Sequence, residues 1–167
     1  GGGRLVALPG QSNSSGIKHP VRACAEACRG EGWDVLVDAA ALAPSGGVDL
    51  ASLGADFVSV SFYKIFGYPT GIGALVARRD ALSRLRKPWF AGGTVRLVSD
   101  PRGGEAVPLM HPRASHEHWE DGTTNFQGAL AVRLGVEWFE GIGRADVAAH
   151  AECLAEWLPP PPPHPPL

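Results

Sequence analysis

Short apolar runs alternate with polar and glycine-rich segments along the chain, a spacing that is typical of α/β proteins. A β-branched run at 35–38 ends in an aspartate, and a second apolar run at 56–61 follows one crossover later. Apolar runs of this length, bounded by glycine and polar residues, predict buried parallel strands. After the glycine turn at 71–73, a further strand is predicted at 74–77.

In much of the remaining chain, apolar residues recur at the spacing that predicts helices. A helix is predicted at 19–29, because Gly30 and Gly32 follow it, and Thr123-Thr124-Asn125 is expected to cap a longer helix that reaches residue 140. Segment 92–120 is rich in Gly, Pro and Arg and lacks periodicity, so we interpret it as an extended loop at a subunit interface. The other predicted helices are 49–54, 79–86 and 145–158, and the apolar face of the long helix is assigned to Leu130, Leu134, Trp138 and Phe139.

Lys64 follows the second predicted strand and precedes a break at Gly67. A lysine amine among apolar residues snorkels to water, pairs with a carboxylate, or loses its proton and becomes a nucleophile. The neutral amine condenses with an aldehyde cofactor such as pyridoxal phosphate. Asp38 ends the first strand at the same predicted sheet edge, where it would either hold the pyridinium nitrogen of the cofactor protonated or serve as a turn carboxylate.

Four stretches carry a resemblance to a known family: Gln-Ser-Asn-Ser-Ser-Gly at 11–16, Val-Asp-Ala-Ala at 37–40, Ser-Phe-Tyr-Lys-Ile-Phe-Gly-Tyr-Pro-Thr-Gly at 61–71, and Glu-Asp-Gly-Thr at 120–123. Together they resemble the cysteine-desulfurase-like domain of molybdenum cofactor sulfurases, whose wider relatives are class V aminotransferases and cysteine desulfurases. The resemblance extends from about residue 5 to about residue 142. It implies an α/β fold, the large-domain core of fold-type I pyridoxal phosphate enzymes, with a mixed, mostly parallel sheet, flanking helices and an incomplete domain.

The resemblance implies a cofactor site for pyridoxal 5'-phosphate. Lys64 would be the Schiff-base lysine, Asp38 the pyridinium partner and Ser61 a hydroxyl donor to the cofactor phosphate. Asn13 resembles an asparagine near the cofactor ring and the substrate carboxylate. Tyr63, counted among the cofactor-binding residues, stands where desulfurases usually carry a histidine.

Two further residues, Gly122 and Thr123, resemble a Gly-Thr pair that reaches the phosphate bound by the other subunit of dimeric relatives, so a homodimer is expected. The chain also departs from the desulfurase pattern. Ala41 stands where desulfurases usually have a glutamine, and the family's nucleophilic cysteine lies well beyond Leu167. The upstream part of the family domain is missing as well, so we expect a fragment of a larger enzyme whose own activity is uncertain.

The function implied by the resemblance is sulfur transfer from L-cysteine to the molybdenum cofactor, with release of alanine. Two alternatives stay open: another class V aminotransferase or lyase that needs no persulfide cysteine, and a non-catalytic remnant acting as an interaction module. The first unit would be a partial domain at 1–158. The second would be a disordered proline-rich tail at 159–167, either a polyproline ligand or a tail without function.

Composition narrows the class of protein. The chain has 167 residues, 44% of them hydrophobic, and a net charge of −2, so no nucleic-acid partner is expected. No apolar run approaches the ~20 residues that span a bilayer, so we expect no membrane association and a cytoplasmic location.

The cysteines and clustered histidines suggest no metal site. Three cysteines cannot form a full disulfide framework. Cys24 and Cys28 would share a helix face, where we interpret them as small core residues. His111, His116 and His118 are interpreted as part of a solvated loop.

Overall fold

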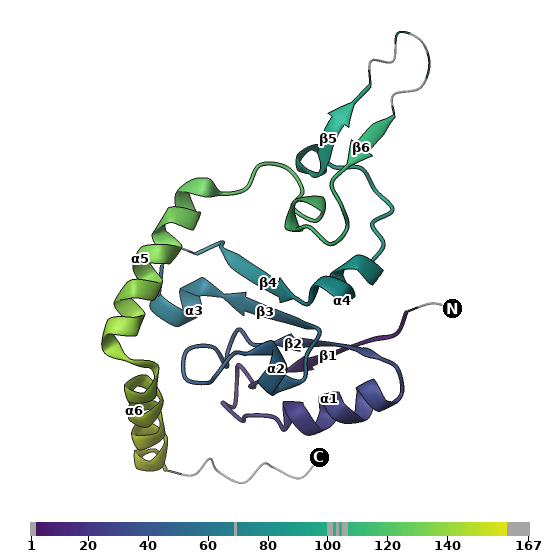
Figure 1. Cartoon of the computed structure of the whole chain (residues 1–167). Coiled ribbons are helices and arrows are strands. Elements are labelled where there is room, and N and C mark those ends of the chain that lie inside the picture. Colours follow the sequence, from purple (N-terminus) through teal and green to yellow (C-terminus); the bar gives the residue numbers. More distant parts are fainter. Residues whose placement is uncertain (1–2, 69, 100–101, 103, 105–106, 160–167) are drawn as a thin grey trace, which may run out of the picture.

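A four-stranded sheet forms the centre of the computed structural model, which describes residues 3–68, 70–99, 102, 104 and 107–159. Its strand order is β1-β2-β3-β4; the first two pairs are parallel and β3 pairs antiparallel with β4 (Figure 1). The mixed, mostly parallel sheet predicted from the sequence is therefore confirmed. The strands are β1 (Leu5–Pro9), β2 (Asp34–Asp38), β3 (Phe57–Ser61) and β4 (Gly73–Ala77).

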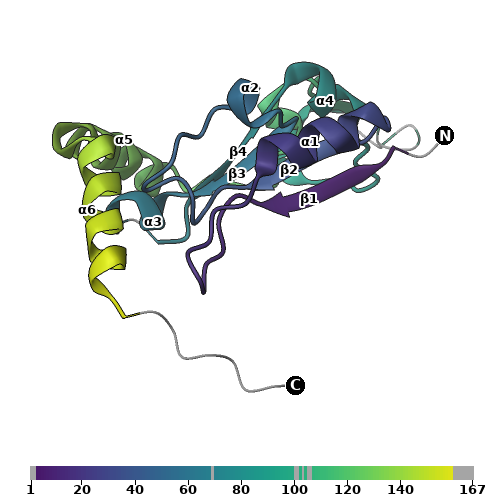
Figure 2. The same cartoon turned by 90° about the horizontal axis from the view of Figure 1, so that it is seen from below.

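Two helices cover one face of this sheet. Helix α1 (Val21–Gly30) and the single turn α2 (Leu50–Leu53) lie over the strands on the same side (Figure 2). Asp49 caps α2 by accepting a hydrogen bond from the backbone N–H of Ser52 at 2.7 Å. The buried apolar cluster lies between these helices and β2 and β3, and consists of Val21, Ala25, Val35, Val37, Ala39, Leu42, Ala55 and Val58.

Three helices stand beyond this layer. Short α3 (Phe62–Phe66) follows β3 directly, and α5 (Phe126–Ile142) and α6 (Arg144–Trp157) rise at the same end of the sheet (Figures 1 and 2). Asn125 caps α5 by accepting from the N–H of Gly128 at 3.0 Å, as the capping sequence predicts. Helix α4 (Arg79–Arg84) follows β4.

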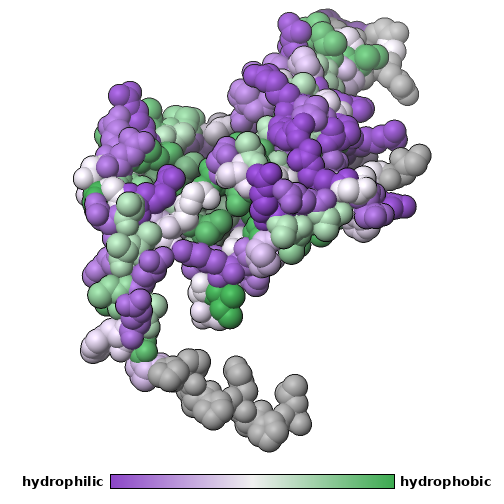
Figure 3. Space-filling view, turned by 60° about the horizontal axis from the view of Figure 1, so that its bottom comes forward, coloured by the Kyte–Doolittle hydropathy of each residue, from purple (hydrophilic) through white to green (hydrophobic). Residues whose placement is uncertain are grey.

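The predicted apolar face of α5 is wrong for most of its residues. Phe139 is buried, but Leu130, Leu134 and Trp138 are 74%, 67% and 60% exposed. The helix instead approaches α3 through Gly135, where a Cβ would overlap the ring of Phe66. The contact with α3 is made at a glycine, and the large apolar side chains of the predicted face remain exposed to solvent. Apolar surface is visible at this end of the molecule (Figure 3).

The prediction of a structureless loop at 92–120 is also wrong. Strands β5 (Val95–Val98) and β6 (Pro108–Met110) form an antiparallel ribbon that projects from the body (Figure 1). Two 3-10 turns, η1 (Gly92–Thr94) and η3 (His116–His118), stand at its base. The ribbon is too short to show clear alternation in sequence.

Candidate functional site

Three parallel strands bring their carboxyl ends to one edge of the sheet. The register pairs Pro9 with Asp38 and Asp38 with Ser59, so β1, β2 and β3 end side by side. Asn13 follows β1, Asp38 ends β2 and Lys64 follows β3. Ligands of open α/β sheets bind outside the carboxyl ends of the strands. The edge that carries these three residues is thus where a ligand is expected on topology alone.

Lys64 and Asn13 are in direct contact although 51 residues separate them in the chain. The Nζ atom of Lys64 donates a hydrogen bond to Oδ1 of Asn13 at 2.8 Å. Lys64 is half-buried rather than enclosed, and it lies on α3 rather than at the tip of a strand. Of the three outcomes considered for this amine, the structure shows neither a carboxylate partner nor full burial among the described residues, and its hydrogen bond goes to an amide oxygen.

Helix α3 places Lys64 in this position. Ser61 has extended backbone and begins the turn, and Gly67 ends it with a φ of 82° while donating to the carbonyl of Tyr63. Glycine adopts this left-handed conformation without the steric cost that other residues have. The turn carries Lys64 back over the edge of the sheet.

Asp38 and Ser61 offer unused polar atoms at the same edge. Oδ1 of Asp38 accepts from the N–H of Ala40 at 3.0 Å, which is the turn role considered as the alternative for this residue. Its Oδ2 atom and the hydroxyl of Ser61 have no hydrogen-bond partner among the described residues. Both groups are therefore available to a ligand.

Of the remaining predicted residues, Tyr63 lies beside this cluster and the Gly-Thr pair lies apart from it. Tyr63 is 43% exposed, and its ring centroid lies 6.0 Å from Nζ of Lys64. Gly122 and Thr123 lie in the turn before α5, and no hydrogen bond joins them to Lys64 within the described part of the chain. The structure thus brings Lys64, Asn13, Asp38 and Ser61 to one edge and leaves the Gly-Thr pair in a separate turn.

The chemistry of this donor set fits pyridoxal phosphate. The aldehyde of this cofactor condenses with an amine, and its protonated ring nitrogen pairs with a carboxylate. Its phosphate accepts hydrogen bonds from hydroxyl and amide donors. Lys64, Asp38, Ser61 and Asn13 supply one of each at the carboxyl edge of the sheet.

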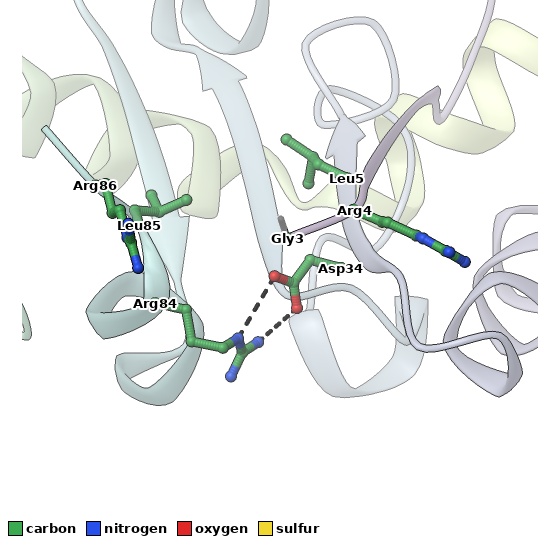
Figure 4. A pocket seen from close by; sticks show the side chains of 7 residues that line it. All are labelled: Gly3, Arg4, Leu5, Asp34, Arg84, Leu85 and Arg86. Atoms are coloured by element: carbon green, nitrogen blue, oxygen red, sulfur yellow. Dashed lines mark hydrogen bonds and ion pairs between the residues drawn. The ribbon is translucent and has the colours of Figure 1, made fainter. Parts of the chain in front are cut away.

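A hollow of about 660 Å³ lies at the opposite edge, where β1 and β2 begin (Figure 4). Its charged groups do not converge on the hollow. Nη2 of Arg84 lies 2.5 Å from Oδ1 of Asp34, and this hydrogen bond raises the pKa of Arg84 above its ordinary value. Arg4 points away in Figure 4, toward Trp33, whose ring centroid is 5.8 Å from its guanidinium carbon. We assign the Arg84 pair to joining α4 to the sheet.

The histidine and cysteine predictions are partly wrong. His118 is only 6% exposed, and its Nδ1 lies 2.7 Å from the carbonyl oxygen of His111, so it is a packed residue rather than a solvated one. Ala25 takes the buried position of α1, while Cys24 is exposed and Cys28 packs at the edge of the core. The described residues contain no group of side chains that could hold a metal ion.

One further cluster, formed by Lys87, Trp89 and Asp121, is not apparent from the sequence pattern. Lys87 contacts Asp121, and Trp89 donates to the same carboxylate at 2.8 Å. The Lys87–Asp121 pair spans 34 positions without a periodic pattern, so only the folded chain reveals it. The pair adjoins the turn at Gly122.

Comparisons with known proteins find relatives of the chain among class-V aminotransferases, molybdenum cofactor sulfurases and cysteine desulfurases. Residues 2–159 match the aminotransferase class-V family. The chain is 37% identical to human molybdenum cofactor sulfurase over 92% of its own length and 18% of that protein, and 37% identical to the Caenorhabditis elegans sulfurase over 83% and 19%. It therefore spans about a fifth of the length of the curated relatives that it matches.

Solved structures agree with the sequence relatives. A cysteine desulfurase from Thermococcus onnurineus NA1 is 31% identical, with a TM-score of 0.80 over 92% of this chain and 37% of that one. A cysteine desulfurase from Escherichia coli is 25% identical at the same TM-score and the same shares. Within the part of the chain that the structure describes, none of the helices has the length and apolar character that crossing a bilayer requires.

Proposed function

The chain belongs to the aminotransferase class-V family, and on that premise we propose that it is the lysine-bearing part of a pyridoxal-phosphate-dependent sulfurtransferase of the molybdenum cofactor sulfurase type. The observation that carries this proposal is the 2.8 Å hydrogen bond between Lys64 Nζ and Asn13 Oδ1, at the sheet edge where Asp38 also ends its strand. An amine, an amide and a carboxylate from three different segments are thereby gathered at one place.

Each residue has a distinct role in the proposal. Pyridoxal phosphate, when bound, supplies an electron sink. Lys64 would hold the aldehyde carbon through Nζ and, when released, accept or return a proton at that atom. Asn13 would orient Nζ, as its present hydrogen bond does. Asp38 would keep the ring nitrogen protonated through a charge-assisted hydrogen bond, and Ser61 would donate its hydroxyl to the phosphate.

The substrate class follows from the relatives. Sulfurases and cysteine desulfurases stand among the proteins most similar to this chain, which supports L-cysteine as sulfur donor, alanine as product and the molybdenum cofactor as acceptor. An alanine–glyoxylate aminotransferase is 17% identical, a level at which only the fold is comparable. The alternative of an aminotransferase or lyase is therefore not favoured.

A homodimer is part of the proposal. Gly122 and Thr123 lie in a turn of their own and have no hydrogen bond to Lys64 in the described chain. A pair of copies related by a two-fold axis would allow this turn to serve the cofactor of the other copy. The expected oligomeric state is thus a dimer, measurable by light scattering.

The test exploits the small number of amines, because the chain has three lysines, Lys18, Lys64 and Lys87. The protein is mixed with pyridoxal phosphate, reduced with borohydride, and the modified peptide is identified by mass spectrometry. We expect the adduct on Lys64, together with a visible absorbance band that disappears in Lys64→Ala. Lys18→Ala is the matched control, since Lys18 is an exposed residue on a loop. The proposal would be refuted if the reduced cofactor adduct were found equally on Lys18 and Lys64 and the visible absorbance band were missing.

A further inference from the structure

A buried ammonium group stands beneath the turn that precedes α5. The side chain of Lys87 is 1% exposed, and its Nζ donates to Asp121 and to the carbonyl oxygen of His118 at 3.3 Å. The indole Nε1 of Trp89 donates to the other carboxylate oxygen of Asp121 at 2.8 Å. Leaving a buried charge unpaired is strongly unfavourable, so Lys87 fixes the position of Asp121. Both contacts lower the pKa of Asp121, with Lys87 as the larger cause.

Gly93 supports the same turn from η1. A Cβ atom at Gly93 would stand 2.5 Å from the carbonyl oxygen of Gly122 and 2.7 Å from that of Glu120. Only a glycine allows two backbone segments to approach this closely. Gly122 itself has a φ of 75°, a conformation that other residues rarely adopt. The turn is therefore held by a side-chain pair and by a backbone contact.

The residue that this turn presents is Thr123. It is exposed, and neither its hydroxyl nor its backbone N–H has a hydrogen-bond partner among the described residues. Two free donors beside a left-handed glycine are suited to an oxyanion. The ammonium of Lys87 compensates the charge of the adjacent Asp121, so the carboxylate does not repel an anion there.

We propose that Lys87, Trp89 and Asp121 are positioning residues that clamp the Gly122–Thr123 turn in the conformation that binds the phosphate of the cofactor. This inference rests on the proposed function for the identity of the anion, but the clamp itself is a property of the contacts described above. Because Lys87 both anchors the turn and neutralises Asp121, its loss removes two favourable effects. Loss of the Asp121 charge removes only the anchor.

Hydrogen–deuterium exchange tests the clamp without any cofactor. The amides of residues 119–125 are compared in the wild-type chain, Asp121→Asn, Lys87→Met and Trp89→Phe. The last change is the mildest, because it keeps an aromatic ring near Lys87 and removes only the indole donor. Asp80→Asn is the matched control, an exposed aspartate paired with Arg78 and Arg84 on α4. We expect the amides of the turn to exchange faster in the three clamp variants than in the wild-type chain. In the control variant their exchange rate should equal that of the wild-type chain.

Affinity for pyridoxal phosphate, measured by titration, tests the consequence. One lost charge-assisted contact corresponds to roughly tenfold weaker binding, and Lys87→Met should weaken it more than Asp121→Asn. Unchanged turn exchange in all three clamp variants would overturn the clamp. A loosened turn with unchanged cofactor affinity would overturn its link to phosphate. A wild-type chain that binds no pyridoxal phosphate would refute the proposed function, and the exchange data would still decide the clamp.

Discussion

Asp56 ties the beginnings of β2 and β3 to the segment that enters α4, and its replacement is the sharpest test of the fold. The residue is 3% exposed, and its Oδ2 accepts a hydrogen bond from the fully buried N–H of Val35 at 2.9 Å. Its Oδ1 lies 3.6 Å from Nη1 of Arg78, and its carbonyl oxygen accepts from the N–H of Arg78 at 3.0 Å. The side chain thus serves one hydrogen bond inside the sheet and one ion pair at the surface.

These two interactions have different expected energies. Asp56→Ala leaves the Val35 N–H buried without an acceptor, which costs roughly 1–3 kcal/mol. The ion pair adds at most about 1 kcal/mol, because Arg78 is 40% exposed and solvent screens the charge. Asp56→Ala should therefore lower the free energy of unfolding by about 1–4 kcal/mol. Asp56→Asn keeps an oxygen acceptor for Val35 and should lower it by about 1 kcal/mol or less.

Urea unfolding followed by far-UV circular dichroism measures both variants against the wild-type chain. A large loss of the free energy of unfolding in Asp56→Ala and a small loss in Asp56→Asn would establish the buried hydrogen bond as the main contribution of Asp56 to stability. Equal losses would refute the reasoning, because they would make the charge of Asp56, rather than its hydrogen bond to Val35, responsible for the effect.

Two further predictions concern α5 and the clamp. Gly135→Val should reduce the free energy of unfolding by roughly 1–3 kcal/mol, because the new side chain overlaps Phe66. Gly141→Val is the control, since its side chain meets open space in the same helix and should not reduce the free energy of unfolding. Thermal unfolding of the two variants measures the difference. Asp121 has a folded-state pKa below its unfolded value, so its contribution to stability is present above about pH 4 and is lost as the pH falls through the folded pKa. Urea titrations at several pH values should show a smaller loss on acidification in Asp121→Asn than in the wild-type chain.

The sheet and its carboxyl edge could be predicted because both depend on local composition. The runs at β2 and β3 are apolar and rich in valine, a β-branched residue that is enriched in strands. Parallel pairing then requires Asp38 and Lys64 to reach the same edge, whatever the details of the loops. The strand β1 that precedes Asn13 was not predicted, so the contact between Lys64 and Asn13 is apparent only in the folded chain.

The errors arose where tertiary contacts override local pattern. Apolar spacing in α5 indicated a buried stripe, but the helix docks through Gly135, which a hydrophobicity pattern does not register. The predicted strand at 56–61 ends where β3 ends, but no helix was predicted for the segment that follows, where the structure has α3. The Lys87–Asp121 pair depends on the path of the intervening ribbon and leaves no signature in the sequence.

The position of the buried cluster has a consequence for the order of folding. All its members lie between Val21 and Val58, and the partly buried residues packed on it extend only to Val6 and Val60. During synthesis this segment leaves the ribosome before α5 and α6 do, so it can collapse before those two helices form. The carboxyl edge that later receives Lys64 would then be assembled early, and the two long helices would dock onto a sheet already formed.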